Sequence, residues 1–148
     1  MTISNLQGIA PGNYTIGLKG VRGTDTEIRY VNLKIHSAAF ENISLISPAN
    51  QSNGLNTTVN LSWNSNINSE SYRVQVATDA AFANLFLNQT TTATNYTVNN
   101  LLQETNYYWR ILPINTCGEA ITGTANTFTT GILTCNQVFT ATDFTFAT

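Results

Sequence analysis

Apolar and polar side chains alternate along much of this chain with a period of two residues. The clearest run is 59–63, where Val59, Leu61 and Trp63 are separated by Asn60 and Ser62. This alternation places apolar side chains on one face of an extended strand, whereas a helix needs a spacing of three to four residues. The helical spacing is absent throughout the sequence. The pattern predicts an all-β protein.

Comparable short runs recur between about residues 43 and 130, at the spacing typical of a β-sandwich. We expect the other strands at 43–46, 72–76, 85–89, 96–98, 107–112 and around Phe128. Ser47-Pro48 should end the first of them, and a tight turn at 79–82 should return Phe82 to the core. The side chains expected to build that core include Trp63, Tyr72, Leu101, Tyr107 and Trp109.

Two earlier runs, 14–19 and 28–35, predict a separate β-hairpin. Gly20, Gly23 and Asp25 lie between them as turn-forming residues. The apolar positions of the second run change phase after Tyr30. Either a β-bulge or a strand covered on both faces would explain this change.

A lone hairpin is marginally stable in water, so its apolar side chains need a partner. These side chains are Tyr14, Ile16, Leu18, Val31, Leu33 and Ile35. They can fold back on the sandwich of the same chain or pair with the same hairpin of a second chain. We favour self-association, which predicts a homodimer formed through residues 1–37.

The composition indicates an extracellular protein. Only 9% of the residues are charged, against about 25% in an average protein. Thr, Asn and Ser replace the missing charges, which favours strands over helices. The net charge is -2 with six Lys and Arg, too few and too scattered for a nucleic-acid partner. No apolar run is long enough for a membrane span. We therefore expect a secreted or cell-surface location.

A set of residues in the middle zone carries a family resemblance. Pro48, Leu61-Ser62-Trp63, Tyr72-Arg73-Val74-Gln75-Val76, Leu101, Tyr107, Arg110 and Asn115-x-x-Gly118 follow one another in an order and spacing that resemble fibronectin type III domains. The spacing from Leu101 to Tyr107 is similar to the family's tyrosine corner, where the phenol bonds back to the preceding backbone.

The resemblance implies a seven-stranded fibronectin type III-like (immunoglobulin-like) β-sandwich, preceded here by an extra β-hairpin. It implies no chemistry, because the members of this family are mostly spacers and binding modules.

The segments around the sandwich predict further modules. We interpret residues 1–38 as the C-terminal hairpin of a truncated immunoglobulin-like domain, 41–131 as the fibronectin type III-like domain, and 132–148 as a linker into a following module. Similar hairpins precede such modules in secreted bacterial metallopeptidases and adhesin-like proteins. The expected partners are therefore neighbouring domains of a longer parent chain.

Candidate chemical groups are few. Cys117 and Cys135 are the only cysteines, and in an extracellular protein we expect a disulfide, with two unpaired thiols as the alternative. The sole histidine, His36, is expected to be a solvated linker residue. Two cysteines and one remote histidine do not make a zinc site. No nucleophile elbow or acid–base pair of carboxylates is evident, so we expect no enzyme, metal or cofactor.

One outward surface is a candidate for protein contacts. If alternate residues of 107–112 point into the core, the others point outward beside the outward residues of 72–76. Exposed Tyr and Arg are typical interface anchors. The candidate interaction surface consists of Arg73, Gln75, Tyr108, Arg110 and Leu112. The simpler interpretation is that these side chains cover the sheet or touch an adjacent module.

These observations predict a non-catalytic extracellular module that acts as a spacer or protein-binding domain in a larger secreted protein. One alternative is a carbohydrate-binding accessory module, which would need a planar row of exposed aromatic rings. Another is a non-catalytic fragment of a secreted metallopeptidase, whose catalytic domain would lie elsewhere in the parent chain.

Overall fold

A computed structural model describes residues 8–132 of the chain. This part consists of strands joined by turns and loops, and it offers no helix that could span a membrane. The strands are β1 (Gly12–Arg22), β2 (Asp25–Ile35), β3 (Leu45–Ser47), β4 (Ser52–Leu55), β5 (Val59–Trp63), β6 (Ser71–Ala77), β7 (Leu85–Thr91), β8 (Asn95–Val98), β9 (Asn106–Asn115), β10 (Gly118–Glu119) and β11 (Ala125–Thr130).

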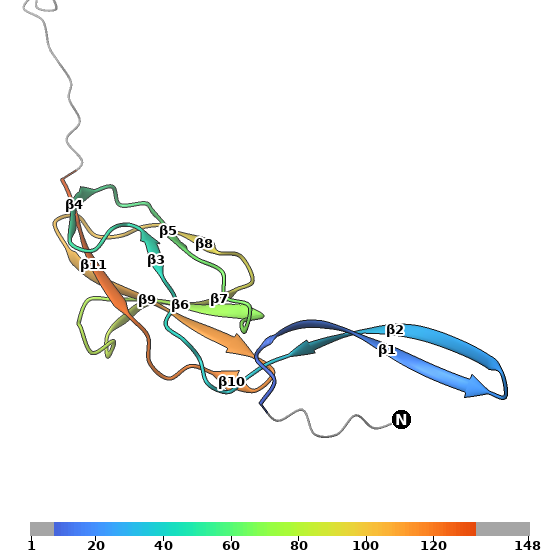
Figure 1. Cartoon of the computed structure of the whole chain (residues 1–148). Helices are drawn as coiled ribbons and strands as arrows, with labels where there is room; N and C mark the ends of the chain where they lie inside the picture. The colour runs from blue at the N-terminus through green and yellow to red at the C-terminus, as the bar shows by residue number, and fades with distance from the viewer. Residues whose placement is uncertain (1–7, 133–148) are drawn as a thin grey trace, which may run out of the picture.

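The strands from β3 onward form two facing sheets, shown in Figure 1. One sheet has the order β4-β11-β9-β6-β7, with β10 paired to β9, and the other has the order β3-β5-β8. The predicted all-β sandwich is confirmed, and its seven expected strands correspond to β3, β5, β6, β7, β8, β9 and β11. The alternation did not reveal β4 and β10, because their sequences, Ser-Asn-Gly-Leu and Gly-Glu, contain too few apolar side chains to alternate with polar ones.

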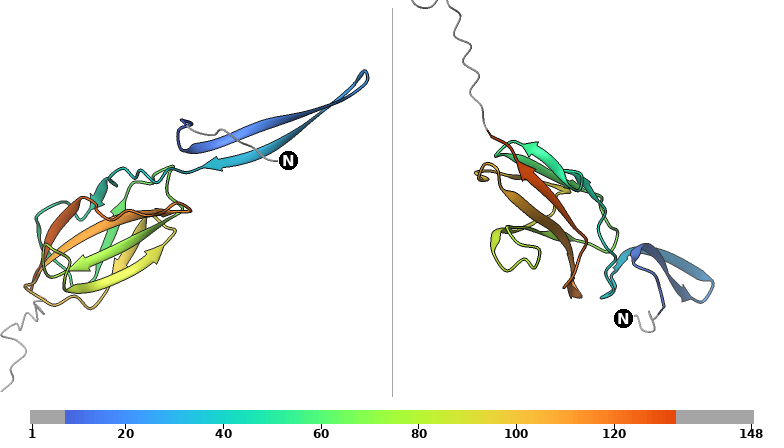
Figure 2. Two further views of the ribbon diagram at one scale, coloured as in Figure 1. Left: turned by 90° about the horizontal axis from the view of Figure 1, so that it is seen from below. Right: turned by 90° about the vertical axis from the view of Figure 1, so that its left-hand side faces the viewer.

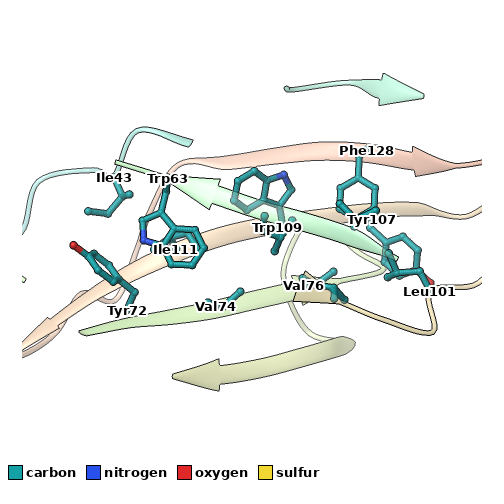
Figure 3. Packing of buried hydrophobic residues seen from close by; sticks show 13 residues of the cluster. Ile43, Trp63, Tyr72, Val74, Val76, Leu101, Tyr107, Trp109, Ile111 and Phe128 are labelled. Atoms are coloured by element: carbon teal, nitrogen blue, oxygen red, sulfur yellow. The ribbon is translucent and has the colours of Figure 1, made fainter. Parts of the chain in front are cut away.

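Aromatic rings fill the space between the two sheets, as Figure 3 shows. Trp63 is 2% exposed, and Tyr107 and Trp109 are fully buried. Tyr72 meets Trp63 edge to face at 5.7 Å, and Tyr107 stacks on Phe128 at 5.5 Å between ring centroids. The core therefore rests on pairs of packed rings, which add to the stabilisation from burial alone.

The tyrosine corner is present at Tyr107. Its hydroxyl accepts a hydrogen bond of 2.9 Å from the backbone N–H of Leu102, and the preceding Leu101 is 3% exposed. The bond holds the crossover between β8 and β9 against the core, as the family resemblance implies.

Phe82 is buried, with 8% exposure, as expected for the turn at 79–82, but it lies outside the cluster of side chains that packs between the two sheets. The left-handed backbone of Phe82, with φ of 57°, directs the ring to the outer face of the β6–β9 sheet. There the guanidinium carbon of Arg110 lies 4.0 Å from the ring centroid. Alternation cannot predict this, because a residue in a turn has no fixed face.

The hairpin of β1 and β2 projects away from the sandwich, as both views of Figure 2 show. Its strands pair without a register shift from Gly12↔Ile35 to Arg22↔Asp25, so a bulge is not the reason for the phase change. The turn consists of Gly23 and Thr24, and the positive φ of Gly23 (62°) fits the turn types that favour right-twisted hairpins. Gly20 and Asp25, expected in the turn, are strand residues.

Replacing Tyr107 by Phe should destabilise the sandwich by about 1–3 kcal/mol, because the N–H of Leu102 loses its buried acceptor. The free energy of unfolding in urea measures the effect. The matched control is Tyr96→Phe, since Tyr96 packs on the same core but its hydroxyl makes no hydrogen bond within the described residues. The control should change stability by less than about 0.5 kcal/mol. Equal effects of the two substitutions would contradict the assignment.

Candidate functional site

The joint between the hairpin and the sandwich is fixed by buried polar side chains. Residues 36–39 cross from the end of β2 to the sandwich, where Asn68 and Asn115 lie beside them. Each asparagine is 6% exposed. Buried amides are costly unless they are hydrogen-bonded, so their partners determine the path of the crossing segment.

Asn68 holds the crossing segment from the β5–β6 loop. Its Oδ1 accepts a hydrogen bond of 2.7 Å from the backbone N–H of Ser37. Its Nδ2 donates to the carbonyl oxygens of Ser37 at 3.0 Å and Ala39 at 3.2 Å. One side chain therefore satisfies both backbone groups of Ser37 and fixes the direction of the segment.

Asn115 connects the same segment to the end of β9. Its Nδ2 donates to the carbonyl oxygen of Asn68 at 2.7 Å, and also contacts the Ser37 carbonyl oxygen at 3.0 Å. Its Oδ1 accepts from the backbone N–H of Cys117 at 2.7 Å. We call Ser37, Asn68 and Asn115 the asparagine clamp.

The clamp is coupled to the aromatic core. Asn66 accepts a hydrogen bond from the N–H of Asn68 at 2.8 Å, which is the local turn geometry that asparagine favours. The N–H of Asn66 in turn donates to the hydroxyl of Tyr72 at 3.0 Å. Because Tyr72 packs on Trp63, the loop that holds the joint is itself held by the core.

His36 is buried at the joint, so the expectation of a solvated linker residue is wrong. Its side chain is 6% exposed, and its Nε2 lies 3.2 Å from Oε1 of Glu70. Glu70 precedes β6, and its backbone N–H bonds the carbonyl of Ile114 at 2.8 Å. The end of β2 is thus packed onto the sandwich rather than exposed.

Sequence reasoning missed the asparagine clamp. Asn115 entered only as part of the family resemblance, and Asn68 carries no signal in a chain rich in asparagine. Burial distinguishes these two from the other asparagines within residues 8–132, and burial at a joint depends on contacts between segments far apart in the sequence.

The outer face of the β6–β9 sheet carries the candidate interaction surface, but its own side chains cover much of it. Arg73 makes a two-point ion pair with Glu119, with Nε–Oε1 at 2.7 Å and Nη2–Oε2 at 2.8 Å. The hydrogen bond to Glu119 raises the pKa of Arg73. Glu119 is positioned by the pairing of β10 with β9.

Two members of the candidate surface are not exposed. Leu112 is 4% exposed and is covered by the loop at Gly123. The loop is so close that a Cβ added at Gly123 would lie 3.1 Å from Cδ2 of Leu112. Gln75 is 9% exposed and accepts a hydrogen bond of 2.8 Å from Nε of Arg110. Arg110 in turn lies over Phe82.

Tyr108 is half-buried, as are Arg73 and Arg110. The five side chains do face outward together, yet they mainly bond and pack among themselves and with the adjacent loops. The simpler interpretation, that they cover the sheet, fits these contacts better than a prepared interface does.

The loop that carries Phe82 is organised by Asp79. Its carboxylate accepts hydrogen bonds from the backbone N–H groups of Asn84 at 2.7 Å, Ala83 at 3.1 Å and Ala81 at 3.0 Å. These donors, Asn84 first, lower the pKa of Asp79 below its ordinary value. The negative charge of Asp79 stabilises the conformation of the loop through these hydrogen bonds, and it does not form a ligand site.

Cys117 is exposed and is not in a disulfide among the described residues. Cys135 lies outside those residues, so the expected disulfide is untested directly. Cys117 follows one end of β9, whereas Thr130 bonds Thr105 beside the other end. The ten residues of β9 extend over about 30 Å, so about this distance separates the two points. From Gly131, the four steps to Cys135 can span at most about 14 Å. A bond within one chain therefore does not fit unless β11 separates from β9.

The joint also contains a hollow of about 320 Å³ beside Pro11, Phe40 and Ile67. Within residues 8–132, no three His, Cys, Asp or Glu side chains come together as a metal site. The hollow is lined by loop residues without a convergent set of charged groups, so its geometry identifies no ligand.

Lowering the pH should release the Asp79 loop only under strongly acidic conditions. The stabilisation is present above the ordinary Asp pKa of about 3.9 and is lost as the pH falls through the lower folded value. The amide NMR signals of Ala81, Ala83 and Asn84 should report this midpoint. In Asp79→Asn the same signals should show no such midpoint. A midpoint at or above the ordinary value would contradict the role of these hydrogen bonds.

Oxidation should leave Cys117 free or join it to a different chain. We expect non-reducing electrophoresis to show monomer with two free thiols, or cross-linked oligomers that disappear in Cys117→Ser. Mass spectrometry of the monomer provides the decisive measurement. A monomer that has lost both thiol hydrogens to a Cys117–Cys135 bond would contradict the geometry.

Comparisons with known proteins agree with the fold. A family model described as "Fibronectin type III domain" matches residues 47–130, more than half of the chain. No curated protein matches the chain.

Several solved structures resemble it. An Fn3-like protein from Clostridium thermocellum is 22% identical, with a TM-score of 0.44, covering 63% of this chain and 90% of that one. The sixth fibronectin type III domain from a human fibronectin type III domain containing protein 3 is 14% identical, with a TM-score of 0.48, covering 67% and 90%.

A two-domain fibronectin type III segment of chicken tenascin is 17% identical, with a TM-score of 0.47, covering 82% of this chain and 66% of that one. The family match agrees with what the structure shows independently: two facing sheets in the order expected of a sandwich, a core built around Trp63, and a tyrosine corner at Tyr107. The chain belongs to the fibronectin type III family.

Proposed function

We propose that this chain is a non-catalytic spacer that holds neighbouring modules of a secreted or cell-surface protein in a fixed orientation. The observation that carries the proposal is the asparagine clamp. A flexible linker would leave the hairpin free to turn, whereas residues 36–39 are bonded to the β5–β6 loop and to the end of β9. The low charge of the chain supports an extracellular location.

The modules at either side are part of the same proposal. Residues 1–38 are the C-terminal hairpin of an immunoglobulin-like module, 41–131 are the fibronectin type III domain, and 132–148 lead into a following module. The hairpin supports this division because it makes its own regular register and leaves one apolar face for another layer. That layer belongs either to the rest of the preceding module or to a second copy of the chain. A secreted bacterial parent, such as a metallopeptidase or an adhesin-like protein, would suit this arrangement.

Glycan binding is less well supported. Planar sugar rings stack on rows of exposed aromatic side chains. In the part of the chain that the structure describes, Tyr108 is half-buried on the sandwich. Tyr30, which is 72% exposed, lies apart from it on the hairpin. These two rings belong to different sheets, so they do not form a single row.

The stiffness of the joint can be measured directly. At a dilution where the chain is monomeric, ¹⁵N relaxation of the hairpin and sandwich amides should give one common rotational correlation time. Asn68→Ala should shorten the correlation time of the hairpin amides, because Ser37 and Ala39 lose their partners. The same substitution should lower the free energy of unfolding by about 1–3 kcal/mol, since it removes the hydrogen bonds of Asn68 to the half-buried backbone of Ser37 and to the carbonyl of Ala39.

The matched control is Asn64→Ala. Asn64 is an exposed residue of the same loop region, and its side chain makes no hydrogen bond within the described residues. Its replacement should leave both correlation times and the stability unchanged. Independent tumbling of the hairpin in the unaltered chain would contradict the proposed spacer role.

A further inference from the structure

Strand β7 is an open edge of the sandwich that lacks the features which usually protect such an edge. It is the last strand in the order β4-β11-β9-β6-β7, so only β6 pairs with it. Natural proteins protect open edges with charged side chains, with proline or by keeping the edge strand very short. β7 has seven residues, and residues 80–103 around it contain no charged residue, proline or glycine. β7 is therefore free to pair with another strand.

The other open edges of the described strands are protected. β3, β4 and β8 have only three or four residues each, and Pro48 directly follows β3. The two hairpin strands are long, but they carry charged side chains at Lys19, Arg22, Asp25, Glu27, Arg29 and Lys34. Within residues 8–132, β7 alone combines a long open edge with uncharged side chains.

The direction of the β7 backbone groups follows from Pro113 in β9. Its carbonyl oxygen accepts a hydrogen bond of 3.0 Å from the N–H of Ala120, so this oxygen points away from β6. Tyr72 of β6 lies opposite Pro113. Two opposite residues of an antiparallel pair exchange either both backbone hydrogen bonds or none. Tyr72 and Pro113 exchange none, so the backbone groups of Tyr72 point the other way, to Thr91 in β7.

Every second residue of β7 therefore directs its backbone away from the sheet. The register between β6 and β7 has no shift from Thr91 to Leu87, and the ladder alternates. Thr91, Gln89 and Leu87 consequently face β6. The N–H and C=O groups of Asn88 and Thr90 face outward, and both residues are exposed.

The neighbouring segments of the same chain lie at the ends of the sandwich and not beside β7. The hairpin joins the sandwich near β10, and β11 leaves it at the opposite end (Figure 1). β7 runs along the side of the larger sheet, where β9 and β6 separate it from β11. A module that continues the chain at either end would cover strand ends, whereas strand addition needs a partner along the length of the edge. The partner that fits β7 therefore comes from another chain.

We propose that β7 pairs with β7 of a second copy of this chain, antiparallel about a two-fold axis at Gln89. In this register Asn88 lies opposite Thr90 of the other copy, so the outward backbone groups of both residues find partners. The pairing goes beyond the spacer role, which concerns the joint within one chain. Its failure would leave that role untouched.

An identical strand suits this edge better than a loose peptide or a charged strand. β7 of a second copy is already extended, so its pairing avoids the entropic cost of ordering a flexible segment. Gln89 then meets Gln89 of the other copy, and each amide can both donate and accept a hydrogen bond. A charged strand of a different protein would find no opposite charge on β7.

Substitutions at Gln89 test the two-fold axis directly. Under reducing conditions, which remove cross-links through Cys117 and Cys135, sedimentation equilibrium of the unaltered chain should show a concentration-dependent dimer. Gln89→Lys and Gln89→Glu should each raise the dissociation constant at least about tenfold, because each places like charges opposite one another. An equimolar mixture of the two variants should dimerise at least as tightly as the unaltered chain, since opposite charges then meet. A mixture as weak as the separate variants would overturn the proposal.

The matched control is Asn95→Lys. Asn95 is an exposed residue of β8, at the edge of the other sheet, and the substitution adds the same charge as Gln89→Lys. It should leave the dissociation constant unchanged within about twofold. Weakening equal to that of Gln89→Lys would show a general effect of charge and would contradict pairing through β7.

Hydrogen exchange of the unaltered chain gives a second measurement that does not depend on a variant folding correctly. The amides of Asn88 and Thr90 should become more protected as the protein concentration rises, whereas those of Leu87 and Gln89, which face β6, should be protected at every concentration. Concentration-dependent protection confined to β1 and β2 would place the contact on the hairpin and overturn the proposal. So would a strictly monomeric chain up to millimolar concentration.

Discussion

A few hydrogen bonds to the backbone of Ser37 fix the path of the chain from the hairpin to the sandwich, and with it the orientation of the hairpin. Its carbonyl oxygen accepts from the side chains of Asn68 and Asn115, and its N–H donates to Asn68. The two asparagines are buried and Ser37 is half-buried, so a different path for residues 36–39 would leave the asparagine amides without these partners. The free energy that the chain would lose by leaving these groups unpaired gives the joint one preferred arrangement.

The sandwich provides the conditions under which those bonds form. The Trp63–Tyr72 pair places the Tyr72 hydroxyl where it can accept from Asn66, and Asn66 in turn orients Asn68. A hydrophobic core and a polar joint are therefore parts of one structure. The outer face contributes in another way: Arg73 with Glu119, and Arg110 with Gln75 and Phe82, tie its strands and loops together.

The sequence allowed the strands to be predicted where one face is buried and the other is wet, as at Val59–Trp63, because burial alone imposes a period of two. It did not allow Phe82 or His36 to be placed, since both lie where the chain turns or crosses and no period applies. It predicted Leu112 and Gln75 on the outer face of the sheet, and both are buried there, because whether a loop or a neighbouring side chain covers such a residue depends on distant segments. For Asn68 the sequence contained no usable signal.

The β4–β11 pair has a mechanical consequence. The crossing segment meets the sandwich at one end, near β10, and β11 leaves it at the other (Figure 1). Tension applied between these two points would pull β4 and β11 along their shared direction, since they run parallel. The bonds of 2.8 Å from Gln51 to Thr127 and from Gly131 to Leu55 would then be strained together in shear rather than broken one after another.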